Sequence, residues 1–255
     1  MKKTLAVLTA VGLMVPLMAK AQSPGLEVSG ELGFVSNYKF RGISQTDNKP
    51  AIQGGFELAH PSGFYAGTWG SNVSNWTNTG GNGMELDLYA GYSTELPMGL
   101  GVDLGAIRYY YPGNTASPKQ NTTEVYVGLS YSILSYTLSR TTTNWFGINA
   151  DNAGGNSKGS LYQDLSLEFP VNDQISLTAH YGRQKVAGKN GQTPFSFSDY
   201  SVGVSYALPN DFSVGLQYVG ASLKDAQKAP ATELFVGGGK QLYKNAAVVS
   251  LTKTF

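Results

Sequence analysis

Apolar and polar residues alternate along most of this 255-residue chain, and this alternation restricts the fold more than any other feature. From residue 84 onward, Met84, Leu86 and Leu88 share one parity, and Glu85 and Asp87 share the other. Successive side chains of a β-strand point to opposite faces, so this segment has one apolar and one polar face. The pattern recurs in segments that begin near residues 124, 164, 175, 200 and 212. The sequence therefore predicts an all-β protein.

The composition excludes several classes of protein. The formal net charge is +1, without the basic excess that is typical of nucleic-acid binding, so we expect no nucleic-acid partner. There is no cysteine, which excludes disulfides, thiolate zinc sites and a cysteine nucleophile. With only two histidines, we expect neither a metal site nor a cofactor site. After residue 22, no apolar run reaches the roughly 20 residues that a membrane-spanning helix needs.

The N-terminus has the pattern of a secretory signal peptide. Lys2 and Lys3 precede an apolar stretch over residues 5–18, and Ala19-Lys20-Ala21 offers a cleavage site before Gln22. We therefore expect residues 1–21 to be removed on export and residues 22–255 to form one domain.

Three features favour a transmembrane barrel over a secreted β-sandwich, which also alternates. The polar faces carry Gly, Ser and isolated acids, while the apolar faces end in Tyr or Phe, as in the aromatic girdles of outer-membrane barrels. Tight connections, such as residues 60–63, 96–99 and 208–211, alternate with long ones rich in Gly, Asn, Thr and Lys. Finally, Val249, Leu251 and Phe255 form an alternating ending that resembles the C-terminal signal read by the barrel-assembly machinery of Gram-negative bacteria.

A parity argument gives the number of strands. Both termini of such a barrel lie in the periplasm, which requires an even number. The sequence predicts an antiparallel up-and-down barrel of about twelve strands, with ten or fourteen still open. Residues 224–245 are assigned to a long external loop, with room for a hairpin of its own. The twelve segments are 26–40, 50–60, 63–74, 84–95, 99–111, 122–132, 134–146, 160–170, 174–186, 198–208, 211–223 and 246–255.

Acidic residues gather on the inward parity of these segments. Rings of Asp and Glu select cations, which predicts a cation-preferring lumen. The rival interpretation places Lys39 and Arg41 at a constriction or at the mouth of the pore, where they would attract anions. A further alternative for Arg41 is a loop anchor bonded to carbonyls or to Asp47. The predicted lumen-lining acids are Glu27, Glu31, Glu57, Glu85, Asp87, Asp103, Glu124, Asp164 and Glu168.

Inward glycines leave two interpretations of equal weight. They could keep the lumen open, or they could relieve crowding and bending of the strands. These glycines are Gly33, Gly55, Gly91, Gly101, Gly105, Gly128, Gly203 and Gly215.

The outward parity predicts contacts with the membrane. Arg108 and Arg140 fall on it near the outer rim, which suggests contact with lipopolysaccharide phosphates. Trp69, Tyr110 and Trp145 are predicted at the external interface. The periplasmic interface is assigned to Tyr92, Tyr131, Phe169, Tyr206, Phe212 and Phe255.

No catalytic residue is expected. The sequence lacks the phosphate-binding, zinc-protease, EF-hand and nucleophile-elbow motifs. His180 lies on the inward parity, whereas the Ser–His pair of an outer-membrane lipase should face the bilayer. An outer-membrane hydrolase is therefore disfavoured.

The most distinctive stretch covers about 40 residues. Residues 36–46 read SNYKFRGISQT, residues 50–55 read PAIQGG, and residues 60–73 read HPSGFYAGTWGSNV. Together with the ending VVSLTKTF, this stretch resembles the TorF-family porins, proteobacterial outer-membrane proteins otherwise described as conserved and hypothetical. The resemblance implies an outer-membrane barrel and a pore, and it provides no catalytic or ligand-binding residues.

These observations predict a porin-like channel for passive diffusion of small hydrophilic solutes across the Gram-negative outer membrane. Twelve strands lie between the filled eight-stranded barrels and the open sixteen-stranded ones, so the loops decide whether the pore conducts. The alternative is a non-conducting surface-recognition or adhesion barrel that acts through loops 145–159 and 224–245.

Overall fold

The computed structural model describes residues 25–74, 83–115, 117, 119–148, 156–188, 195–223, 236–237 and 240–255. The predicted signal peptide, residues 1–21, lies outside them. None of the helices in this part of the chain is long and apolar enough to cross a membrane.

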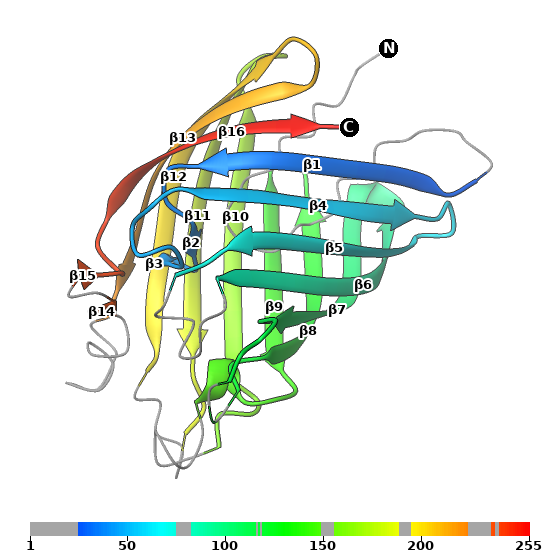
Figure 1. Ribbon diagram of the computed structural model, residues 1–255. Helices are drawn as coiled ribbons and strands as arrows, with labels where there is room; N and C mark the ends of the chain where they lie inside the picture. Colours follow the sequence, from blue (N-terminus) through cyan, green and yellow to red (C-terminus); the bar gives the residue numbers. More distant parts are fainter. Residues whose placement is uncertain are drawn as a thin grey trace.

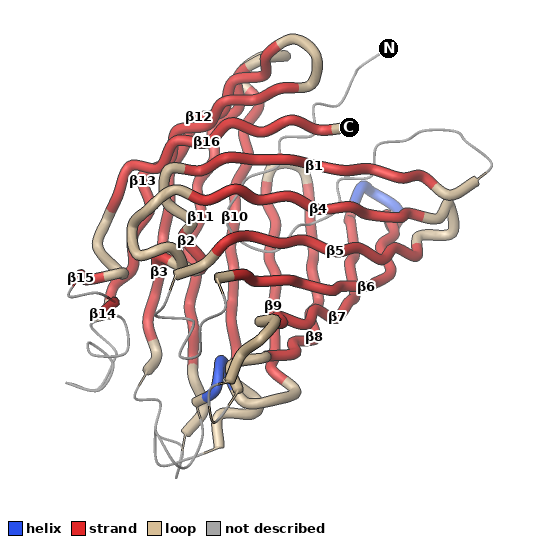
Figure 2. The backbone as a smooth tube through the Cα atoms, in the orientation of Figure 1, coloured by secondary structure: helices blue, strands red, loops and turns tan. Residues whose placement is uncertain are grey.

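Twelve antiparallel strands form a closed barrel, in which each strand pairs with its neighbour and the first pairs with the last (Figure 1, Figure 2). The predicted all-β, up-and-down architecture is confirmed, because sequence neighbours pair around the whole circumference. The strands are β1 (Glu27–Val35), β4 (Ala51–Ala59), β5 (Phe64–Asn72), β6 (Met84–Leu96), β7 (Leu100–Tyr110), β8 (Thr122–Tyr131), β9 (Leu134–Thr141), β10 (Leu161–Pro170), β11 (Ile175–Lys185), β12 (Phe197–Leu208), β13 (Phe212–Ser222) and β16 (Ala246–Thr254).

Two small hairpins and two short 3₁₀ helices complete the described elements. The hairpins pair β2 (Lys39–Phe40) with β3 (Ile43–Ser44), and β14 (Val236–Gly237) with β15 (Lys240–Gln241). The second hairpin lies in the last long loop, residues 224–245, for which the sequence pattern allowed a hairpin. The helices are η1 (Pro97–Gly99) and η2 (Trp145–Gly147).

Two predicted strands were too long. The first was expected to run over residues 26–40, but β1 ends at Val35, and the chain then turns through positive φ at Arg41 (48°) and Gly42 (76°). The seventh was expected to reach residue 146, but β9 ends at Thr141 and is followed by η2. In both cases the chain leaves the wall of the barrel earlier than predicted.

The two ends of the barrel differ. Short connections of a few residues join β4 to β5, β6 to β7, β8 to β9, β10 to β11 and β12 to β13. We call this the short-turn end, and it also holds the start of β1 and the end of β16. The other connections are longer and define the long-loop end.

The outer face of the barrel is apolar and the inner face is polar, which is the reverse of a water-soluble sandwich. Leu, Val and Phe side chains of the strands are exposed, including Phe56 at 67%, Val28 at 64% and Leu104 at 47%. Their strand neighbours on the other parity are Gly, Ser, Thr, Tyr and carboxylates, most of them buried. A continuous exposed apolar surface of this kind is stable in contact with lipid.

Tyrosine rings lie flat against the inner wall. Three of them each lie opposite a glycine on the neighbouring strand, in the pairs Tyr65–Gly91, Tyr89–Gly67 and Tyr126–Gly105. A Cβ atom at any of these glycines would collide with the facing phenol group. At these positions the missing side chain provides the space for a tyrosine ring, so Gly91 and Gly105 do not simply widen the lumen.

Candidate functional site: an inner hairpin and an acidic inner face

The first long connection folds back into the barrel. We call residues 36–50, which contain β2 and β3, the hairpin segment. Its side chains are largely buried, including Lys39 and Ser44. At its tip, a Cβ atom on Gly42 would lie 2.6 Å from the carbonyl oxygen of Gly220 and 2.8 Å from Cβ of Asp199. The tip therefore packs directly on the inner wall formed by β12 and β13.

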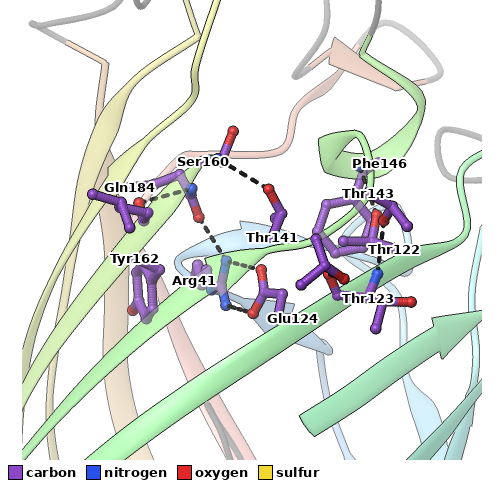
Figure 3. A network of polar contacts seen from close by, with 12 residues as sticks. Arg41, Thr122, Thr123, Glu124, Thr141, Thr143, Phe146, Ser160, Tyr162 and Gln184 are labelled. Carbon is purple, nitrogen blue, oxygen red and sulfur yellow. Dashed lines mark hydrogen bonds and ion pairs between the residues drawn. The ribbon is translucent and has the colours of Figure 1, made fainter. Parts of the chain in front are cut away.

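Arg41 joins the hairpin segment to another part of the wall. Its Nη2 lies 2.7 Å from Oε2 of Glu124 on β8, and its Nη1 donates to Oε1 of the same carboxylate at 3.1 Å. Nη1 also donates to Oε1 of Gln184 on β11 at 2.6 Å, and the guanidinium lies 3.9 Å from the ring centre of Tyr162 (Figure 3). Burial alone would lower the pKa of Arg41, but the interactions with Glu124, Tyr109 and Tyr162 together raise it.

The anchor predicted for Arg41 was partly wrong. Asp47 was named as its alternative partner, yet Asp47 pairs with Lys49 at 3.8 Å. Arg41 instead contacts Glu124, which lies 83 residues away in sequence.

Lys39 joins the hairpin segment to the last long loop. Its Nζ donates to the carbonyl oxygens of Lys244 at 2.7 Å, Leu242 at 3.0 Å and Gly42 at 3.4 Å. Burial lowers the pKa of this ammonium group to about 8. The cation is thus held by backbone oxygens within the protein.

Two tyrosines outside the strands cover the Glu85 carboxylate of β6. Tyr38 donates to its Oε1 at 2.6 Å, and Tyr111 donates to its Oε2 at 2.5 Å. Burial, followed by the charge of Glu85, raises the pKa of both phenols, so both remain donors at neutral pH. Asp87, one step further along β6, is 5% exposed, and its Oδ1 has no hydrogen-bond partner among the described residues.

The predicted external tryptophan girdle is wrong. Trp69 lies on the inner parity of β5, and its ring packs edge-on against Tyr38 at 5.4 Å between ring centres. Trp145 is 5% exposed, within η2, and packs against Phe197. Trp69 faces inward because it shares the parity of Tyr65 and Ser71 on β5, whereas Trp145 is buried because it lies in η2, after β9 has ended. Tyr110 lies on the outer face as predicted, at 38% exposed.

Charges in the strands are segregated by sign. All Asp and Glu residues of the twelve barrel strands lie on the inner parity, including every acid predicted there: Glu27, Glu31, Glu57, Glu85, Asp87, Asp103, Glu124, Asp164 and Glu168. All Lys and Arg residues of those strands lie on the outer parity: Arg108, Arg140, Arg183, Lys185 and Lys253. Among the described residues, Arg41 of the hairpin segment forms an ion pair with one of these acids, Glu124, whereas Lys39 of the same segment donates to carbonyl oxygens outside the strands.

Two inner acids were not among the predicted ones. Glu95 is the last inner residue of β6, and Asp199 follows Phe197 on the inner face of β12. Extending the alternation of Ser201 and Gly203 two residues back would have found Asp199. Its Oδ1 lies 2.7 Å from Nε2 of His180, whose Nδ1 lies 2.8 Å from Oδ2 of Asp164.

His180 thus bridges two carboxylates on the inner face. Ser166 Oγ donates to Asp164 Oδ1 at 2.6 Å and lies 3.4 Å from Nδ1 of His180. No group of three or more potential metal ligands is arranged to hold an ion in the part of the chain that the structure describes.

The outer face carries the remaining predicted residues. Arg108 and Arg140 are exposed there, near the long-loop end. Val249, Leu251 and Phe255 are exposed on the outer face of β16 and at its end, with Phe255 at 73%. The periplasmic aromatic set lies on the outer face at the short-turn end: Tyr92, Tyr131, Phe169, Tyr206, Phe212 and Phe255.

A family model described as "Bacterial protein of unknown function (Gcw_chp)" matches residues 18–255. The chain belongs to this family. The description assigns no activity, and the resemblance to TorF-family porins stays a prediction. No curated protein matches the sequence significantly.

Solved porins share the fold of this Gcw_chp member. The KdgM porin is 9% identical with a TM-score of 0.55, and the match covers 89% of this chain and 99% of KdgM. The NanC porin is also 9% identical with a TM-score of 0.53, covering 89% of this chain and 98% of NanC. A further KdgM structure is a complex with disordered oligogalacturonate. At these identities the similarity concerns the fold, and it extends over nearly the whole of both porins.

Proposed function

We propose that this protein is an outer-membrane channel for the passive diffusion of small hydrophilic solutes, with a preference for cations. The observation that carries the proposal is the segregation of charge in a closed barrel, with strand carboxylates inside and strand cations outside. Carboxylates along a narrow path lower the energy of an entering cation, and the low-dielectric wall focuses their field.

Several inner acids remain available to a solute. Glu27, Glu31, Glu57, Asp87, Asp103 and Glu168 form no ion pair with another described residue. Most of them lie between the hairpin segment and the short-turn end. The Oδ1 of Asp87 has no hydrogen-bond partner among the described residues, and burying it without a donor or a cation is costly.

The hairpin segment sets the constriction in this proposal. It occupies the long-loop end of the lumen, where it contacts β8, β11, β12 and β13. Arg41 and Lys39 do not favour the rival anion funnel, because one is neutralised by Glu124 and the other donates to backbone carbonyls.

The solute is expected to differ from the one in the KdgM complex. Oligogalacturonate is a polyanion, and the inner acids of this barrel would repel it. Cationic and neutral polar solutes fit the inner face better.

Planar-bilayer recording of the purified full-length protein tests the proposal. A tenfold KCl gradient should give single channels whose reversal potential has the sign of K⁺ selectivity. A reversal potential of Cl⁻ sign would contradict the cation preference. A folded barrel that inserts but never conducts would contradict the channel and favour the recognition barrel.

A further inference from the structure

A band of cations lies on the outer face at the long-loop end of β7, β9 and β11. Arg140 on β9 and Lys185 on β11 both pair with Leu161 on the intervening β10, so the two cations lie in one cross-strand row. Arg183 lies two residues from Lys185 on the same face. Arg108 on β7 pairs with Thr123 of β8. Val125, two residues further along the same face of β8, pairs with Arg140. We call these four residues the rim band.

The charged heads of the rim band lie where the strands meet the loops. The Arg140 guanidinium is close to Gly159 in the loop before β10, because a Cβ atom there would lie 3.6 Å from Nη2. Arg108 donates to Oγ1 of Thr123 at 3.0 Å, near the start of β8, and Arg183 donates to Oγ of Ser198 at 3.1 Å, near the start of β12. Arg108, Arg140 and Lys185 are exposed on the outside of the barrel.

The other described strands carry no such charge on their outer face at this end of the barrel. On β12, β13, β16, β1, β4, β5 and β6, the described strands have no Lys or Arg on the outer face at the long-loop end. The outward residues there are polar or apolar, as at Phe34, Ile52, Asn72, Met84, Ser222 and Ala247. Among the described strand residues, the outer-face cations at the long-loop end therefore lie in one sector of the circumference.

We propose that the rim band binds the phosphate groups of a phosphorylated glycolipid of the outer leaflet, as in lipopolysaccharide. Guanidinium groups match phosphate oxygens in a two-pronged geometry and are weakly hydrated, which suits a site at the edge of the hydrocarbon. Cations spread along one cross-strand row fit a ligand with two phosphates on a sugar backbone better than a single ion. The site is separate from the lumen and does not depend on conduction.

Binding of purified lipopolysaccharide to the full-length protein in detergent tests the site, with native mass spectrometry as the readout. In the triple variant Arg108→Gln/Arg140→Gln/Lys185→Gln, we expect affinity to fall at least tenfold. Lys253→Gln is the matched control, because Lys253 lies on the same outer parity at the short-turn end, and it should bind as the original protein does. Removal of the phosphates from lipopolysaccharide should weaken its binding to the original protein. The remaining affinity should be no higher than the affinity of intact lipopolysaccharide for the triple variant.

Three results would overturn the proposal: unchanged affinity in the triple variant, equal binding of the dephosphorylated lipid, or equal competition by phosphatidylglycerol. A dimeric original protein and a monomeric triple variant, both measured without lipid, would also overturn the proposal. They would indicate that the rim band is a contact between two copies of this protein. Heat-modifiable migration on a gel reports folding of each variant. Should the triple variant not fold, Arg140→Gln alone should still weaken binding about threefold, and unchanged binding there would reject the site.

Discussion

Arg41 and Glu124 form a buried two-pronged ion pair that crosses from the hairpin segment to β8, with both side chains 2% exposed. The pair connects a segment that is not part of the barrel wall to one that is. It therefore holds the hairpin segment inside the barrel.

Removing one member of this pair should release the hairpin segment. In Glu124→Gln, the Arg41 cation stays buried without its counter-ion, which typically costs about 3–5 kcal/mol. We expect larger and noisier single-channel currents and a lower Tm. Arg41→Met/Glu124→Leu removes both charges and should recover most of the lost Tm. Unchanged current and Tm in Glu124→Gln would show that the pair does not hold the segment.

Neutralising unpaired inner acids should reduce cation selectivity. Glu31 and Glu57 lie on the neighbouring strands β1 and β4, both on the inner face. In Glu31→Gln/Glu57→Gln, the reversal potential in a KCl gradient should move towards zero with little change in Tm. Asp173→Asn, in an exposed short turn, is the control and should leave the potential unchanged. An unmoved reversal potential in the double variant would argue against the acidic-lumen mechanism.

A methyl group at Gly105 should destabilise the barrel. Its Cβ atom would occupy the position of the Tyr126 phenol, so the ring must leave the wall. We expect Gly105→Ala to reduce the free energy of unfolding by about 1–3 kcal/mol in urea titrations. At Gly128, on the same face, the nearest atom to the new Cβ is 3.4 Å away, so Gly128→Ala should have a smaller effect. Equal losses in the two variants would contradict the tyrosine–glycine fit.

Raising the pH should strengthen docking of the hairpin segment. Burial lowers the pKa of Lys39 to about 8 from its ordinary 10.5. Between these values the released segment binds more protons than the docked one, so deprotonation favours docking, whereas below pH 8 both are charged. Current fluctuations should therefore decrease from pH 8 to pH 10. Lys39→Met should lose this dependence, and a persisting one would assign it to another group.

The C-terminal residue should matter for assembly more than for stability. Phe255 is exposed on the outside at the short-turn end, so its ring adds little packing within the protein. Phe255→Ala, which keeps the two backbone hydrogen bonds between this residue and Gly30, should reduce the amount of folded barrel in outer-membrane fractions, measured by heat-modifiable migration. The refolded, purified variant should keep its Tm. A normal amount of folded variant in the outer-membrane fraction would contradict the role in assembly that the C-terminal sequence pattern suggests.

The sequence by itself determined the wall of the barrel. Alternation with period two assigns each strand residue to a face, so Met84 and Glu85 were placed on opposite sides without any tertiary information. The requirement for an even number of strands then favoured twelve, and the order of short and long connections gave the two ends. These features are local, or follow from the pairing of neighbours along the chain.

Only the tertiary structure decided what fills the barrel. Alternation stops being informative once β1 ends at Val35, because the hairpin segment takes its conformation from contacts with β8, β11 and β12, which are far away in sequence. Contacts between residues far apart in sequence also placed Trp145 in the interior and Asp199 beside His180, whereas the inward face of Trp69 follows from the alternation of β5 itself. The alternation of a strand indicates which side of the wall a residue faces. Only the closed barrel determines which residues contact one another across the interior.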